Sequence, residues 1–169
     1  TDLTLGNSSV PENAGANAVV GTLTATGDPD AGATHSYALV AGTGDTDNAA
    51  FNIDGASLRL TASADFEVKS SYSVRVRADD GLGGTFDKAF TISVTNVNEA
   101  PTDISLSNAS IPENAGANAI IGALSALGDP DAGATHTFAL VSGTGSTDNG
   151  AFILSGNSLR LSASSRSRR

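Results

Sequence analysis

The chain contains one sequence unit twice, at a constant offset of 101 residues, from position 11 to position 112. Pro-Glu-Asn-Ala-Gly-Ala-Asn-Ala occupies 11–18 and returns at 112–119. Gly-Asp-Pro-Asp-Ala-Gly-Ala-Thr-His occupies 27–35 and returns at 128–136. A unit of about a hundred residues exceeds the roughly 20 to 50 residues of solenoid and propeller repeats, and it matches a self-contained domain repeated in tandem. The repeat therefore predicts two similar domains in series.

Within one unit, the residue pattern is that of short β-strands and of no amphipathic helix. Apolar and polar residues alternate in segments that are separated by clusters of Gly, Asp, Asn and Ser. Tyr72, Val74, Val76 and Ala78, for example, form one apolar face, and 90–94 repeats the alternation. We expect seven strands, over 3–10, 19–26, 35–40, 50–53, 57–60, 72–78 and 86–97. This count predicts an all-β fold of immunoglobulin-like sandwiches.

The composition limits the partners of the chain. It carries 18 acidic and 9 basic residues, and three of the basic ones, Arg166, Arg168 and Arg169, lie in the last four positions. Such an acidic chain repels nucleic acid and anionic membranes and favours multivalent cations. Cysteine is absent, so thiolate metal sites and disulfides are excluded. No apolar run reaches the roughly 18 residues of a membrane span, and we expect any export signal or anchor of the parent protein to lie outside this sequence.

Acidic side chains are concentrated in the predicted loops. Asp28 and Asp30 flank Pro29, and Asp80 follows a predicted strand. Glu12 follows a proline, while Asp65 and Glu67 flank a phenylalanine. Residues at alternate positions of extended backbone point to the same side, and Ca²⁺ prefers six to eight oxygen ligands. Any one of these pairs alone is more often a solvated turn than a metal site.

The two units are joined by a short polar segment, Asn-Val-Asn-Glu-Ala-Pro, at 96–101. Asn96, Asn98 and Glu99 supply side-chain oxygens, and Pro101 stiffens the exit into the second unit. We therefore expect a metal at this joint.

Five motifs occur in the order of a cadherin repeat, and the chain resembles the tandem cadherin-like repeats of large bacterial surface proteins. The motifs are Pro-Glu-Asn at 11–13, Asp-Pro-Asp at 28–30, Asp-Phe-Glu at 65–67, Ala-Asp-Asp-Gly at 78–81 and the joint at 96–101. The resemblance covers the whole first unit and about sixty residues of the second. It implies Greek-key sandwiches at 1–95 and 102–169, with a calcium-binding linker at 96–101.

The resemblance also implies which residues hold the ion. In the family, calcium binds between successive domains, so neighbouring repeats are the partners of each repeat. Carried over to this chain, the junction ligands would be Glu12, Asp65, Glu67, Asn96, Asn98, Glu99, Asp129 and Asp131. Asp28, Asp30 and Asp80 (or Asp79) match ligands that face a preceding repeat, and we expect them to form a weaker, open half-site.

Two departures from the family pattern weaken this expectation. The family linker reads Asp-x-Asn-Asp-Asn-Ala-Pro, whereas this linker has Asn96 and Glu99 in place of two aspartates and is one residue shorter. Fewer ions or weaker binding would follow. The second unit also has Ser-Arg-Ser-Arg at 165–168, where the first has Ala-Asp-Phe-Glu at 64–67. We expect it to lack its last two strands, through a frameshift or a truncation, and to be less stable than the first.

Other candidate residues indicate structural roles. His35 and His136 occupy equivalent positions with no second His or Cys nearby, which favours packing or turn bonding. Tyr37 and Phe138 interchange at equivalent positions, which favours a core role. No nucleophile elbow or phosphate-binding glycine loop is present, and the chain has no Trp. We therefore expect no enzymatic activity.

Two functions fit these observations. The first is a calcium-rigidified spacer in an extracellular or cell-surface adhesin, whose parent protein binds a cell-surface glycan or protein. The second is a module that itself binds a ligand, either carbohydrate or an identical repeat. The low aromatic content, 5%, favours the spacer.

Overall fold

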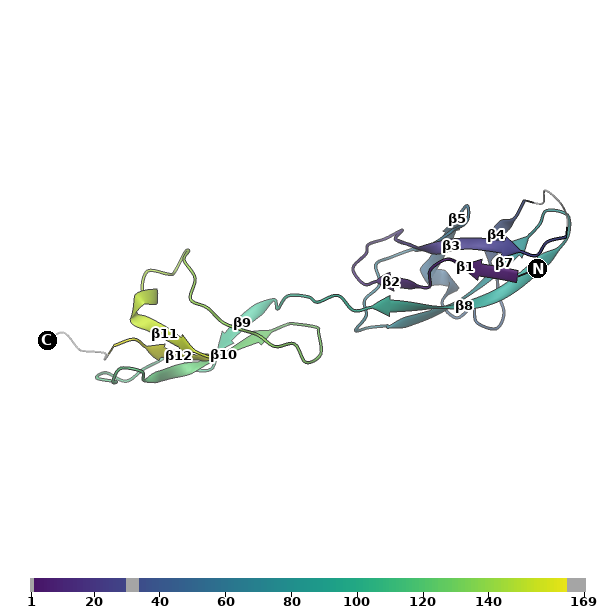
Figure 1. Cartoon of the computed structure of the whole chain (residues 1–169). Helices are drawn as coiled ribbons and strands as arrows, with labels where there is room; N and C mark the ends of the chain where they lie inside the picture. Colours follow the sequence, from purple (N-terminus) through teal and green to yellow (C-terminus); the bar gives the residue numbers. More distant parts are fainter. Residues whose placement is uncertain (1, 30–33, 164–169) are drawn as a thin grey trace. The chain divides into compact units, whose positions relative to one another are not determined.

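The computed structural model describes residues 2–29 and 34–163. The chain divides into two compact units, which we term unit 1 (Thr1–Val97) and unit 2 (Asn98–Arg169) (Figure 1). The segment 96–101 contributes its first two residues to unit 1 and the other four to unit 2. Its assignment as a calcium-binding linker stays a prediction. None of the helices in the described residues has the length and apolar character that a membrane span requires.

Unit 1 is a sandwich of two four-stranded sheets. The first sheet has the order β1 (Asp2–Leu5), β3 (Val19–Thr26), β6 (Ser57–Leu60) and β5 (Phe51–Asp54), all antiparallel. The second has the order β2 (Ser9–Pro11), β8 (Thr85–Thr95), β7 (Ser71–Asp79) and β4 (Ser36–Leu39). β2 runs parallel to β8, and the other pairs of this sheet are antiparallel. A single turn of 3₁₀ helix, η1 (Asn48–Ala50), precedes β5.

The expected strand over 3–10 is wrong, because this segment forms two strands in different sheets. β1 pairs with β3, whereas β2 crosses to β8. The Asn7 side chain fixes the crossing by donating hydrogen bonds to the carbonyls of Val20 (2.8 Å) and Ser9 (2.6 Å). Gly21 permits this close approach, because a Cβ there would lie 2.8 Å from the Asn7 backbone nitrogen. The alternation of residues cannot show a change of sheet, since it continues through the crossing.

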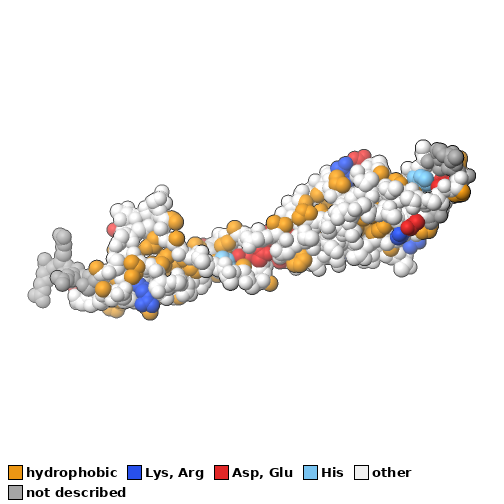
Figure 2. Space-filling view, in the orientation of Figure 1, with side chains coloured by type: hydrophobic (Ala, Val, Ile, Leu, Met, Phe, Trp, Pro, Cys, Tyr) orange, Lys and Arg blue, Asp and Glu red, His pale blue; other side chains and the backbone are white. Residues whose placement is uncertain are grey.

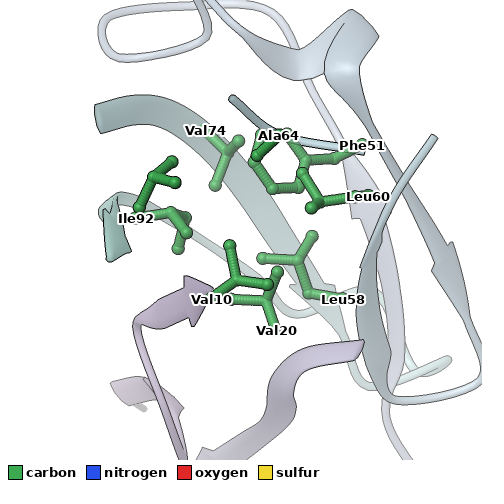
Figure 3. Close-up of a cluster of buried hydrophobic side chains, with 9 residues drawn as sticks. Val10, Val20, Phe51, Leu58, Leu60, Ala64, Val74 and Ile92 are labelled. Carbon is green, nitrogen blue, oxygen red and sulfur yellow. The ribbon is translucent and has the colours of Figure 1, made fainter. Parts of the chain in front are cut away.

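The inner faces of the two sheets form the core of unit 1. The surface in view is mostly neither hydrophobic nor charged (Figure 2), while apolar side chains from both sheets meet inside (Figure 3). Leu58, Val74 and Ile92 are fully buried, and burial of such a side chain stabilises the fold by about 1.5–3 kcal/mol. Val76 and Ala78 are also buried. The predicted inward face of 72–78 is therefore confirmed.

The described residues of unit 2 form one four-stranded sheet. This sheet has the order β11 (Phe152–Ser155), β12 (Ser158–Leu161), β10 (Ile120–Leu127) and β9 (Asp103–Leu106), and it repeats the first sheet of unit 1. A 3₁₀ turn, η2 (Asn149–Ala151), precedes β11. Residues 110–112 and 137–140, which correspond to β2 and β4, are described but form no strand. The arginines at 166 and 168 lie outside the described residues.

Candidate metal centre

Three acidic side chains converge at the end of unit 1 where β2 and β8 end. The carboxylate oxygens of Glu12, Asp65 and Glu67 lie within 4.8 Å of one another. Glu12 is 3% exposed, and it is the one charged side chain that is buried among the described residues. Asp65 and Glu67 are exposed. A buried carboxylate beside two exposed ones therefore forms an acidic site that is open to solvent.

Backbone amides hold the Glu12 carboxylate in place. Oε2 accepts a hydrogen bond from the Phe66 N–H at 2.8 Å, and Oε1 accepts one from the Val97 N–H at 2.7 Å. The Glu12 N–H itself donates to the Thr95 carbonyl at 3.0 Å. The glutamate thus ties the end of β2 to the 65–67 turn and to the residues after β8. These bonds repay the desolvation cost of a buried carboxylate.

The local turn fixes the other two acids. The Asp65 Oδ1 accepts the Val68 N–H at 2.9 Å, and the Asp65 carbonyl accepts the Lys69 N–H at 2.9 Å. Glu67 Oε1 accepts a hydrogen bond from the Asn96 side-chain amide at 3.0 Å. Unit 1 therefore brings four of the predicted ligands, Glu12, Asp65, Glu67 and Asn96, to one end of the sandwich.

The chemistry of this donor set fits a hard divalent cation. All four side chains offer oxygen, and none offers sulfur or imidazole nitrogen, which suits Ca²⁺ better than a transition metal. Each carboxylate has about four lone-pair sites, so an oxygen that accepts one amide hydrogen can also coordinate an ion. Like charges about 4 Å apart cost on the order of 1 kcal/mol per pair in bulk water and more near a protein surface. A bound cation would remove that cost.

Unit 2 brings the other four predicted junction ligands together beside its first residues, Asn98 and Glu99. Asp131 Oδ2 accepts the Glu99 N–H at 2.7 Å, and the Asp131 N–H donates to Asp129 Oδ1 at 2.9 Å. The Asn98 side-chain amide donates to the Glu99 carbonyl at 3.0 Å. A hollow lies over this group, lined by Asn98, Glu99, Ala100, Pro101, Asp129, Gly133, Ala134, Thr135 and His136. The eight predicted ligands thus form two groups, one in each unit.

The predicted open half-site lies at the opposite end of unit 1. Asp80 Oδ1 accepts the Leu82 N–H at 2.8 Å and the Gly84 N–H at 2.9 Å. The hydrogen bond from the Leu82 amide is the main cause that holds the pKa of Asp80 below its ordinary value. Burial acts against this shift, and the amides of Gly84 and Gly83 add to it. Asp28 shares a small pocket with Asp80. Asp79, the alternative ligand, accepts the Gly81 N–H at 2.8 Å. Asp30 lies outside the described residues.

Each histidine contacts a predicted metal ligand, a pairing that was not predicted from the sequence. His35 Nε2 lies 3.0 Å from Asp28 Oδ2, and His136 Nε2 lies 2.7 Å from Asp129 Oδ2. Both aspartates are 10% exposed at the side chain. The signal was present, because an Asp and a His recur seven residues apart in both units. Spacing alone does not show that the turn folds back to bring the two side chains together.

No protein-family profile matches the chain. Among solved structures, human protocadherin-24 EC1-2 is similar at 19% identity and a TM-score of 0.61, over 97% of this chain and 78% of that one. Protocadherin Gamma B7 extracellular cadherin domains 1-4 are similar at 21% identity and a TM-score of 0.56, over 99% of this chain. The chain spans 42% of the length of that structure. These likenesses show that the chain has a cadherin-like fold of immunoglobulin-type β-sandwiches.

Proposed function

We propose that this chain is a calcium-dependent structural and adhesive repeat segment of an extracellular, adhesin-type bacterial protein. The observation that carries the proposal is the convergence of Glu12, Asp65 and Glu67 within 4.8 Å at the end of unit 1. The similar solved structure of protocadherin Gamma B7 consists of extracellular cadherin domains, which supports an extracellular location. On this proposal the chain acts by holding successive repeats in a rigid array.

The residues of the chain have distinct parts in this function. When bound, Ca²⁺ supplies positive charge that cancels the repulsion among the carboxylates. Glu12 is preorganised by two backbone amides, so its carboxylate needs no reordering. Asp65 and Glu67 provide exposed carboxylates that an ion can reach from solvent. Asn96 contacts Glu67 and adds an amide oxygen to the donors nearby.

We assign the second group, Asn98, Glu99, Asp129 and Asp131, to the same junction. Its members are joined by hydrogen bonds within unit 2, so the group is ordered by its own unit. Calcium that engages both groups would restrain the joint at 96–101. Asp28, Asp80 and Asp30 are assigned to a weaker half-site that faces another repeat.

Calorimetric titration of the full chain with Ca²⁺ tests the proposal. We expect a Kd of about 10⁻⁴ to 10⁻³ M, as for extracellular calcium modules. The variant Glu67→Gln keeps the shape of the side chain and removes one charge, and it should weaken binding at least about tenfold. Asp131→Asn tests the unit 2 group in the same way.

The repeat supplies a matched control for this titration. Glu113 occupies in unit 2 the position of Glu12, but it is exposed, and arginines stand at 166 and 168 where unit 1 has Asp65 and Glu67. Glu113→Gln should therefore leave the affinity unchanged. Absence of heat at millimolar Ca²⁺, or equal weakening by Glu113→Gln and Glu67→Gln, would contradict the proposal.

Small-angle scattering tests the mechanical part of the function. Restraint of the joint should lengthen and stiffen the chain when Ca²⁺ is added, and chelation should reverse the change. Glu67→Gln should need more Ca²⁺ for the same effect. Scattering curves that are identical with Ca²⁺ and with chelator, in a chain that binds calcium by calorimetry, would leave binding intact and refute the spacer function.

A further inference from the structure

We propose that His136 is a positioning residue for the calcium ligands of unit 2, because its imidazole holds the Asp129 carboxylate in the orientation in which it binds the ion. The inference rests on the proposed calcium function and deepens it. It adds a residue that donates no atom to the ion, and none of the predicted ligands is a histidine.

The first observation is the contact between the two side chains. His136 Nε2 lies 2.7 Å from Asp129 Oδ2. An ionised carboxylate can only accept hydrogen bonds, so Nε2 carries the hydrogen and donates it. The Asp129 side chain is 10% exposed and the His136 side chain is 25% exposed, so little solvent competes for this bond. Because Ca²⁺ prefers oxygen, the imidazole serves the ligand and does not replace it.

The backbone of Asp129 is restricted by its neighbour, but its side chain needs other restraints. Pro130 follows Asp129 and confines the Asp129 backbone to extended conformations. The side-chain torsions are left free by this restriction. The Asp131 N–H donates to Oδ1 at 2.9 Å, and His136 donates to Oδ2. One donor on each oxygen fixes the plane of the carboxylate and leaves a lone pair on each oxygen for an ion.

The oriented carboxylate belongs to a series of hydrogen bonds that reaches the joint. Asp131, whose N–H holds Asp129, accepts the Glu99 N–H through Oδ2 at 2.7 Å. His136, Asp129 and Glu99 line the same hollow. His136 therefore stands at one end of a series of contacts whose other end is the backbone of the segment 96–101.

The equivalent pair in unit 1 shows that the local turn forms this contact. His35 Nε2 lies 3.0 Å from Asp28 Oδ2, at the same spacing of seven residues. The residues after His35 form β4, whereas the residues after His136 form no strand. The contact is present in both cases, so it depends on the turn and not on the strand that follows. Substitution of His136 should therefore leave the sheet of unit 2 intact.

Calorimetric titration of the full chain with Ca²⁺ tests the inference, and the relevant Kd is the one that Asp131→Asn weakens. His136→Leu removes the donor and should raise this Kd at least about tenfold, as loss of a residue that orients a metal ligand does. His136→Gln keeps an N–H donor at the same number of bonds from the backbone, and it should raise the Kd less than about threefold. Thr137→Leu introduces the same apolar side chain at the exposed neighbouring position, outside the hollow, and should leave the Kd unchanged.

A double-mutant cycle distinguishes positioning from a merely structural role. If His136 acts through Asp129, His136→Leu should weaken binding no further in a chain that already carries Asp129→Ala. Amide hydrogen exchange with chelator present should be the same for His136→Leu and the unaltered chain in β9, β10, β11 and β12.

The possible results separate this inference from the calcium function. Equal weakening by His136→Leu and His136→Gln, additive effects in the cycle, or faster exchange across the sheet in His136→Leu would overturn the positioning role. An unchanged Kd in His136→Leu would also overturn it, while leaving the calcium function intact. Absence of calcium binding by the unaltered chain would overturn both.

Discussion

Glu12 Oε1 accepts the backbone N–H of Val97 at 2.7 Å across a sequence separation of 85 residues. The bond joins the end of β2 to the last residue of unit 1. Glu12 Oε2 accepts the Phe66 N–H. One buried side chain therefore connects three segments of unit 1 at its acidic end. The residue that we assign to calcium is therefore also a residue that stabilises unit 1.

Replacement of Glu12 should destabilise unit 1 even without calcium. Glu12→Ala removes two hydrogen bonds to a charged acceptor and leaves the amides of Phe66 and Val97 without that partner, at a cost of about 3 kcal/mol. Loss of the repulsion between Glu12 and the carboxylates of Asp65 and Glu67 stabilises the folded state by about 1 kcal/mol. A net loss of about 2 kcal/mol should appear in urea unfolding with chelator present. Glu113→Ala, the matched change in unit 2, should cost less than about 0.5 kcal/mol.

Calcium should raise the melting temperature of unit 1. At about 10 mM Ca²⁺ and a Kd of about 10⁻⁴ M, binding to the folded state contributes about 2.7 kcal/mol. For a domain of this size the shift is roughly 10–20 °C. Calorimetry with Ca²⁺ and with chelator measures it. A shift of the same size in Glu67→Gln would show that calcium acts elsewhere.

Asp47 should make unit 1 sensitive to acid. Burial opposes ionisation of the Asp47 carboxylate, but the Lys69 ammonium and the Ser73 N–H outweigh this effect. They hold the pKa of Asp47 below the ordinary 3.8. The Ser73 N–H donates to Asp47 Oδ2 at 2.8 Å. A lowered pKa in the folded state gives stability that is present above the unfolded pKa and is lost as pH falls through the folded pKa.

The loss in Asp47→Asn, about 1 kcal/mol at neutral pH, should therefore shrink as the pH falls below 3.8. Unfolding by urea over this pH range measures the difference from the unaltered chain. Asp148→Asn changes the exposed equivalent in unit 2 and is the control. A difference that stays constant with pH would show that the charge of Asp47 does not contribute.

Removal of the equivalent leucine side chain should destabilise unit 1 more than unit 2. Leu58→Ala removes a fully buried side chain and should cost about 3 kcal/mol. Leu159→Ala, at the equivalent but partly buried position, should cost about 1 kcal/mol, because fewer contacts are lost. Hydrogen exchange of the unaltered chain should likewise show weaker protection in unit 2. Equal protection in both units would contradict the expectation that unit 2 is the less stable one.

Much of the candidate site could be predicted from the order of acidic motifs. Glu12 and the acidic residues of the turn at 65–67 were expected to belong to one site. In the structure, the carboxylate oxygens of Glu12, Asp65 and Glu67 lie within 4.8 Å of one another. Burial of Glu12 and its bond to Val97 could not be predicted, because both depend on how β2 pairs with β8. The contact between His136 and Asp129 was missed for a similar reason, since it requires a loop that folds back.

The sequence by itself determined the repeat, the alternation that makes the core faces, and the placement of acids in loops, because these are properties of neighbouring residues. Tertiary structure decided which segments become strands. Ser9–Pro11 forms β2 beside β8, whereas the nearly identical Ser-Ile-Pro at 110–112 forms no strand. Likewise 36–39 forms β4 beside β7, while 137–140 does not. A strand is stabilised by hydrogen bonds to a partner, so the same local sequence gives different structures when the partner differs.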